Sequence, residues 1–152
     1  MKRLFIYPAL AMVFFMNTAS MCSSDSSASS TDPTPVINTA KQGTWRVTSY
    51  IDSGTDETNH FTGYNFTFDN NNVLTASNGT NTYTGTWLVT TDDSNDDSPS
   101  NDLDFNIAFA SPADFLELTD DWHITTYTAT TISLTDVSGG NGGTDVLVFT
   151  KN

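Results

Sequence analysis

The sequence predicts an all-β domain: an eight-stranded antiparallel up-and-down barrel with one short helix between strands five and six. Two observations lead to this prediction. From Gln42 to the C-terminus, short segments alternate apolar and polar residues between turns rich in Gly, Asn and Asp, which is typical of antiparallel sheet. Closure into a barrel would remove the unpaired edges of such short strands. At 152 residues the chain has room for one such domain.

The alternation places the eight strands along the chain as follows: residues 44–51, 63–68, 73–77, 82–90, 103–109, 122–127, 131–136 and 145–150. In the first strand, Trp45, Val47 and Ile51 are expected on the inner face and Tyr50 on the outer face, because successive side chains in a strand point to opposite sides. The sequences DNNN and NGTN supply turns before and after the third strand.

The segment SPADFLEL, which begins at Ser111, predicts the helix. Ser111 is expected as the N-cap, Pro112 as the first helical residue, and Asp114 as the partner that completes a capping box. Phe115 and Leu118 are three residues apart, so both are expected to face the sheet. We expect this helix to form a lid or plug at one end of the barrel.

The N-terminus has the layout of a secretory signal. Lys2 and Arg3 precede a mostly apolar segment from Leu4 to Met16, and small residues follow. Residues 1–21 are therefore predicted to be a signal peptide, which is too short for a transmembrane helix.

Cys22 is the only cysteine of the chain, so no disulfide can form within it, and a free thiol in an oxidising compartment is a liability. The stretch TASMCSSDSS resembles a bacterial lipobox, in which a cysteine after small residues is acylated before cleavage, and it is similar to the surface-export tags of Bacteroidetes. The resemblance implies palmitate-type acyl chains on Cys22 and an outer-membrane, surface-exposed lipoprotein of the cell envelope. Ordinary cleavage after Ser20, giving a soluble secreted protein, is the alternative.

Residues 22–41 are rich in Ser, Thr and Asp and are predicted to be a flexible tether to the barrel domain, residues 42–152. All 18 acidic residues follow Cys22, and the formal net charge of the chain is −13. The negative electrostatic field of this charge repels nucleic acid and anionic lipid headgroups. The lipid anchor is therefore the expected membrane contact, and no nucleic-acid partner is expected. The protein is expected to be a monomer.

Two GTW sequences carry a family resemblance. Gly43 and Trp45 in QGTWRVTSY resemble the G-x-W motif of lipocalins, and the second GTW, from Gly85 to Trp87, is similar to the mid-barrel strand of bacterial lipocalin-like domains. The span from Gly43 to Lys151 resembles the small, calycin-like, lipocalin-like lipoproteins of Bacteroidetes. The resemblance implies that Trp45 closes the narrow end of the barrel beneath a basic side chain, for which Lys151 is available.

Aromatic side chains are the main candidates for binding. In a lipocalin they would enclose a small hydrophobic ligand, and the alternative is a filled core, because an eight-stranded barrel can be just wide enough for its own side chains. The leading hypothesis is a ligand-binding, lipid-anchored envelope protein, and the alternative is a structural or adhesive surface lipoprotein with a filled barrel. The ligand-lining candidates are Trp45, Tyr64, Phe66, Phe68, Tyr83, Trp87, Phe105, Phe109, Phe115 and Trp122.

Residues for catalysis are few. His60 lies in a predicted loop and His123 on a strand face opposite Trp122, and neither belongs to a nucleophile or metalloprotease motif. Asp120 and Asp121 are neighbours and are interpreted as a turn before a strand, since adjacent strand side chains point apart. The protein is therefore expected not to be an enzyme.

One acidic loop, residues 92–102, offers oxygen ligands for calcium. Asp93, Asn95 and Asp97 fall at offsets one, three and five of an EF-type loop, with Asp104 at offset twelve. The glycine that such a loop needs for its bend is a serine in this chain, so a solvated acidic hairpin loop is the alternative. Ca²⁺ at these residues is the one cofactor considered.

Overall fold

A computed structural model describes residues 32–91, 102–137 and 143–152. In these ranges nine strands form one sheet, and eight of them close into an antiparallel barrel because β1 pairs with both β3 and β9. The elements are α1 (Thr34–Ala40), β1 (Trp45–Asp52), β2 (Thr55–Asp56), η1 (Thr58–Phe61), β3 (Asn65–Phe68), β4 (Val73–Ser77), β5 (Thr82–Thr91), β6 (Leu103–Phe109), α2 (Ala113–Leu116), β7 (Asp120–Tyr127), β8 (Thr131–Val137) and β9 (Thr144–Lys151). The predicted barrel, with a short helix between its fifth and sixth strands, is confirmed.

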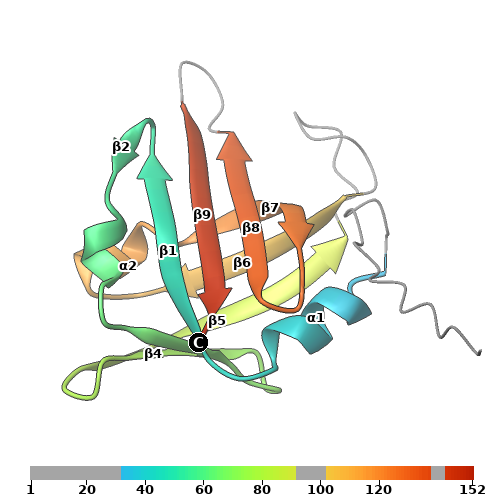
Figure 1. The fold of residues 1–152 in the computed structure, drawn as a ribbon, viewed down its shortest axis with the longest axis horizontal. Helices are drawn as coiled ribbons and strands as arrows, with labels where there is room; N and C mark the ends of the chain where they lie inside the picture. The colour runs from blue at the N-terminus through green and yellow to red at the C-terminus, as the bar shows by residue number, and fades with distance from the viewer. Residues whose placement is uncertain (1–31, 92–101, 138–142) are drawn as a thin grey trace, which may run out of the picture.

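The walls of the barrel are arranged as Figure 1 shows. β1, β9 and β8 form the front wall, and β5 and β6 cross behind them at a steep tilt. The two-residue strand β2 pairs only with the far end of β1, as a small hairpin outside the closed barrel. α2 and η1 lie toward one end of the barrel, and α1 lies at the other end, where β1 begins and β9 ends.

Alternation along the strands builds the core, as predicted. In β6 the inward side chains Phe105 and Ile107 are at most 2% exposed, whereas Asp104 and Asn106 point outward. The inward positions of neighbouring strands meet in register, for example Trp87 opposite Ile107. The interior is thus one continuous core of hydrophobic side chains that are each no more than 7% exposed.

The face expected for the end of β1 is wrong. The register of β1 against β9 shifts between Val47 and Ser49, which marks a β-bulge. One extra residue in a strand turns every later side chain to the opposite face. Tyr50 is therefore buried at 2% exposure, and Ile51 lies half-buried on the outer face.

The tether predicted over residues 22–41 is wrong for its last part, because residues 34–40 form α1. Val36 and Ala40 on this helix are fully buried. Both are apolar side chains that a free tether would leave in water, so their burial stabilises the docked helix. Residues 22–31 lie outside the described residues. Within the described residues, no helix has the length and apolar character needed to cross a membrane.

The capping predicted for the second helix is also wrong. Pro112, with a ψ of −174°, is the N-cap of α2, and no side chain caps the helix, so Ser111 and Asp114 do not form a capping box. The carbonyl oxygen of Pro112 accepts hydrogen bonds from the amides of Phe115 and Leu116. The helix is therefore one residue later and much shorter than the sequence suggested.

All three tryptophans tie a connecting segment to the barrel. Each indole ring is at most 4% exposed, and each indole N–H donates to a backbone carbonyl oxygen outside the barrel strands. A buried N–H needs such a partner. The pairs are Trp45 with Ala40 of α1 at 2.8 Å, Trp87 with Asp69 of the β3–β4 turn at 3.0 Å, and Trp122 with Leu118 after α2 at 3.0 Å.

Candidate functional site

The structure places the ten aromatic ligand-lining candidates in the barrel interior. Eight of them are buried, and Tyr64 and Tyr83 are partly buried against the same core. Eight of the ten rings contact another ring of the set, as where Phe68 meets Trp87 and Phe105 at centroid distances of 5.2 and 5.3 Å. Packing within the hydrophobic core accounts for their burial, and a role in lining a ligand stays a prediction.

Phe115 closes the end of the barrel beside α2. Its side chain is 1% exposed, and Leu118, which lies just after α2, is fully buried, whereas Leu116 is 48% exposed, so the predicted burial of Phe115 and Leu118 is confirmed. The Phe115 ring is the centre of an aromatic cluster and has geometry typical of favourable ring pairs. Its centroid lies 5.4 Å from Phe61, 5.0 Å from Tyr64, 6.0 Å from Phe66, 4.9 Å from Tyr83 and 5.1 Å from Phe109.

Trp45 closes the opposite end of the barrel. The Nζ atom of Lys151 lies over the Trp45 ring, 5.8 Å from its centroid, within the range of a cation–π contact. Gly43 has a φ of +89°, and a Cβ atom at this position would lie 3.1 Å from Cε of Lys151. The arrangement of Gly43, Trp45 and Lys151 that the family resemblance implies is therefore present.

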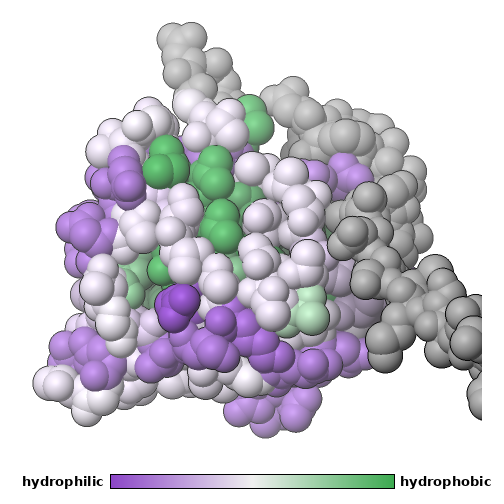
Figure 2. Space-filling model, viewed as in Figure 1, coloured by the Kyte–Doolittle hydropathy of each residue, from purple (hydrophilic) through white to green (hydrophobic). Residues whose placement is uncertain are grey.

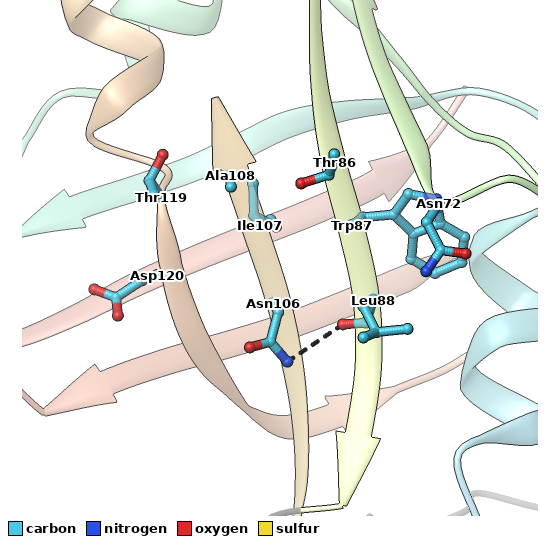
Figure 3. A pocket seen from close by; sticks show the side chains of 9 residues that line it. All are labelled: Asn72, Thr86, Trp87, Leu88, Asn106, Ile107, Ala108, Thr119 and Asp120. Atoms are coloured by element: carbon cyan, nitrogen blue, oxygen red, sulfur yellow. Dashed lines mark hydrogen bonds between the residues drawn. The ribbon is translucent and has the colours of Figure 1, made fainter. Parts of the chain in front are cut away.

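A pocket of about 530 Å³ lies on the outer face of β5, β6 and β7 (Figure 3). It is lined by Asn72, Thr86, Trp87, Leu88, Asn106, Ile107, Ala108, Thr119 and Asp120. The side-chain amide of Asn106 donates to Thr90 Oγ1 at 3.0 Å and to the Leu88 carbonyl oxygen at 3.5 Å. These bonds fix the amide nitrogen, and its carbonyl oxygen then faces toward the β7 side of the pocket. The pocket thus combines polar groups with the exposed side chain of Leu88.

Asp120 is the titratable group of this pocket. Burial at the start of β7 raises the pKa of Asp120 to about 6, a side-chain hydrogen bond with Asp121 adds to the shift, and the negative charges of Asp136 and Asp121 act in the same direction. The backbone amide of Asp121 donates to the Asp120 carboxylate at 2.9 Å and opposes the shift. Both residues belong to β7, so their interpretation as a turn is wrong.

The raised pKa of Asp120 predicts a change in stability with pH. The folded protein holds this proton up to about pH 6, whereas the unfolded chain releases it near pH 3.8, so the free energy of unfolding falls as pH rises through this window. Asp120→Asn should remove that loss. One pKa unit corresponds to about 1.4 kcal/mol, and solvent screening at this partly exposed site reduces the expected gain at pH 7 to about 1 kcal/mol.

Urea unfolding at pH 3 and pH 7 measures this effect. The two proteins should have the same free energy of unfolding at pH 3, and Asp120→Asn should be more stable at pH 7. An equal difference at both pH values would contradict the assignment of the pH dependence to Asp120.

Three polar side chains that the sequence analysis did not group together meet near the α2 end of the barrel. Nδ1 of His60 lies 3.2 Å from Oε2 of Glu117 and 3.9 Å from Oε2 of Glu57. The hydrogen bond with Glu117 raises the pKa of His60, and the charges of Glu117, Asp114 and Glu57 act in the same direction. We call these three residues the Glu57–His60–Glu117 cluster. Among the residues that the structure describes, this is the one group of His, Cys, Asp or Glu side chains that brings three potential metal-ligand atoms within 4.8 Å of one another.

The remaining sequence candidates lie elsewhere. Nδ1 of His123 is 3.8 Å from a carboxylate oxygen of Asp102, on the outer face of the barrel. Asp104 pairs with His123 across β6 and β7, and its three proposed calcium partners, Asp93, Asn95 and Asp97, lie outside the described residues, as does the lipidation candidate Cys22. Calcium binding and lipidation stay predictions.

The wall opposite the pocket carries a narrow apolar strip. Figure 2 shows hydrophobic atoms grouped over β1, β9 and β8, surrounded by more polar surface. Ile51 pairs with Val146, and both point outward and are half-buried. Val137, at the end of β8, is 61% exposed.

The fold is similar to that of a DUF4847 family protein. The crystal structure of this protein, from Bacteroides vulgatus ATCC 8482, aligns with a TM-score of 0.50 over 77% of this chain and 97% of the other, with 19% sequence identity. At this identity the likeness concerns the fold alone. No protein-family model matches the chain, and the comparison with curated proteins gives no significant match.

Proposed function

We propose that the protein is a non-catalytic, lipid-anchored protein of the bacterial cell envelope that acts through the outer surface of a filled barrel. The position of Phe115 is the observation that carries this proposal. A carrier would need space at the barrel mouth, but the Phe115 ring occupies that end, 1% exposed and in contact with five other rings. Packing of this kind supports a structural or adhesive lipoprotein over a carrier of a small hydrophobic molecule.

The outer pocket is where a partner would bind to this surface. Thr86, Asn106 and Asp120 offer hydroxyl, amide and carboxylate groups, and Leu88 offers apolar surface beside them. This combination suits a partner with many hydroxyl groups and some apolar carbon, such as an envelope glycan, since polar groups fix orientation and apolar groups add contact area. The acidic charge of the chain disfavours nucleic acid and anionic lipid as the partner.

The docking of α1 at the end of the barrel is compatible with a lipid anchor on Cys22. Because α1 docks at the Trp45 end, only residues 23–33 would separate the acylated cysteine from the folded domain. A fully extended segment of this length spans at most about 40 Å. The domain would therefore stay close to the membrane, with the Trp45 end toward the anchor.

Fractionation of the host cells tests the anchor, and native mass spectrometry of the protein from its own membranes tests the filled barrel. Wild-type protein should be in the membrane fraction with acyl groups on Cys22, and Cys22→Ser should move to the soluble fraction, because two or more acyl chains give stable anchoring. Ser23→Ala is the control and should stay on the membrane. A membrane-bound Cys22→Ser protein would contradict the anchor, and a co-purifying apolar molecule would contradict the filled barrel.

A further inference from the structure

We propose that the Glu57–His60–Glu117 cluster is a divalent transition-metal site, best suited to Zn²⁺, that joins η1 to α2. The three side chains come from two connections that are far apart in the sequence, one between β1 and β3 and one between β6 and β7. The site is separate from the outer pocket and from the lipid anchor, so it goes beyond the proposed function.

The first two ligands come from one turn of 3-10 helix. Glu57 is the N-cap of η1, and the amide of His60 donates to the Glu57 carbonyl oxygen at 3.0 Å. With three residues per turn, side chains at positions i and i+3 lie on the same side of a 3-10 helix. The turn is attached to β1, because the Glu57 amide donates to the Tyr50 carbonyl oxygen at 2.9 Å and the Tyr50 amide donates to Thr58 Oγ1 at 2.8 Å.

The third ligand is held against the same point of β1. Glu117 is the C-cap of α2, and its carbonyl oxygen accepts a hydrogen bond from the Tyr50 hydroxyl at 2.9 Å. The rings of Phe61 and Phe115, one from each connection, meet edge to face at 5.4 Å. Tyr50 and this ring pair therefore fix both backbones, so the two glutamates and the histidine converge on one point.

The two distances from His60 Nδ1 agree with one ion, and all three ligand atoms lie within 4.8 Å of one another. In a tetrahedral zinc site with bonds of about 2.0–2.2 Å, ligand atoms are about 3.3–3.6 Å apart. The observed separations of 3.2 Å and 3.9 Å from His60 Nδ1 bracket this range. The three side chains are 27–33% exposed, so small rotations of the glutamates suffice to close the geometry.

The donor set selects the class of ion. Imidazole nitrogen suits zinc and its first-row neighbours, whereas calcium and magnesium prefer oxygen ligands alone. Two carboxylates balance the charge of a divalent ion, and three protein ligands leave a fourth position for water, as in open zinc sites. The net charge of −13 raises the local concentration of cations.

The competing explanation is an ion pair between protonated His60 and the two glutamates. Metal titration separates the two, since an ion pair alone takes up no zinc. Calorimetric titration of the full chain, freed of metal with EDTA, with ZnCl₂ at pH 7 should show one ion bound per chain. His60→Ala and Glu117→Gln should each weaken binding by at least about tenfold.

His123→Ala is the matched control, because it removes the other histidine of the chain, and it should bind zinc as the wild type does. Circular dichroism of each variant should be unchanged, since the substituted side chains are partly exposed. A Co²⁺ titration gives a second readout: a visible absorption band that is present in wild type and His123→Ala and lost in His60→Ala. Failure of wild type to bind zinc, or equal binding by His60→Ala, would overturn the proposal, whatever the outcome for the anchor and the filled barrel.

Discussion

Replacing Phe115 with alanine is expected to lower the free energy of unfolding by about 3–5 kcal/mol. Truncation of a buried phenylalanine removes its apolar burial and leaves a cavity that the surrounding structure fills only in part. Phe115 is 1% exposed and meets rings from η1, β3, β5 and β6. These neighbours are fixed by η1 and by their strands and cannot collapse onto the vacated space without losing their ring contacts with one another. Chemical denaturation of the two proteins measures the difference.

Leu116→Ala is the control for this prediction. Leu116 follows Phe115 in the same helix but is 48% exposed, so its truncation should change the free energy of unfolding by no more than about 0.5 kcal/mol. Equal effects of the two substitutions would contradict the assignment of Phe115 as the plug of the barrel.

The Phe115→Ala protein also tests whether the barrel is filled. An apolar cavity left by a large side chain stays dry and takes up small apolar molecules. Benzene should therefore raise the melting temperature of Phe115→Ala by mass action and leave that of the wild type unchanged. Equal stabilisation of the wild type would indicate that the barrel already has internal space, and would favour a carrier.

Period-two alternation was sufficient to predict the strands and their buried faces. β6 shows why: Phe105 and Ile107 face a dry interior while Asp104 and Asn106 face water, so burial of one face and solvation of the other fix the strand and its orientation together. Such a pattern is local and needs no knowledge of the partner strand. Near α2, Phe115 and Leu118 are both buried as predicted, although Leu118 lies beyond the end of the helix and the predicted capping is wrong.

The errors arose where the pattern depends on contacts that are distant in the sequence. Tyr50 is inside because β1 contains a bulge against β9, and nothing in the sequence TWRVTSYI marks the extra residue. Two apolar residues, Val36 and Ala40, are too few to predict a helix in a polar segment. They are buried only because α1 docks at the end of the barrel. His60 and Glu117 are 57 positions apart, so their contact required the fold, although the spacing of Glu57 and His60 was a local signal for a shared turn face.

The two GTW sequences show that similar motifs can have different physical causes. Gly43 has a positive φ and lies against the Lys151 side chain, so it is required by backbone conformation and by the contact over Trp45. Gly85 lies where β5 approaches β6, and a Cβ atom there would overlap the carbonyl oxygen of Ala108 and lie 2.8 Å from the ring of Phe109. The second glycine therefore makes room for the aromatic cluster around Phe115.

The three tryptophans hold connecting segments against the barrel. Each ring fills part of the interior, and each N–H holds a connecting segment in place. Trp45 has the largest role of this kind, because it holds α1, lies under Lys151 and is fully buried. The docking of α1 therefore depends on its contacts with the barrel, which include the Trp45 hydrogen bond and the burial of Val36 and Ala40, because a helix of seven residues is too short to be stable alone.

Trp45→Ala is accordingly expected to lower the free energy of unfolding by about 3–5 kcal/mol. Trp45→Phe keeps an apolar ring but removes the indole N–H, which leaves the Ala40 carbonyl oxygen without this donor and should cost about 1–3 kcal/mol. Arg46→Ala, at the adjacent exposed position, should change stability by no more than about 0.5 kcal/mol.

Amide hydrogen exchange in Trp45→Phe distinguishes loss of the docked helix from general destabilisation. The amides of Ile37 and Lys41, which donate within α1, should exchange faster by a larger factor than those of β5 and β6, since a helix without its anchoring bond opens without unfolding the barrel. Equal acceleration in all three elements would mean that α1 and the barrel unfold as one unit. In that case the helix would belong to the folded core, and the Trp45 hydrogen bond would not be its separate anchor.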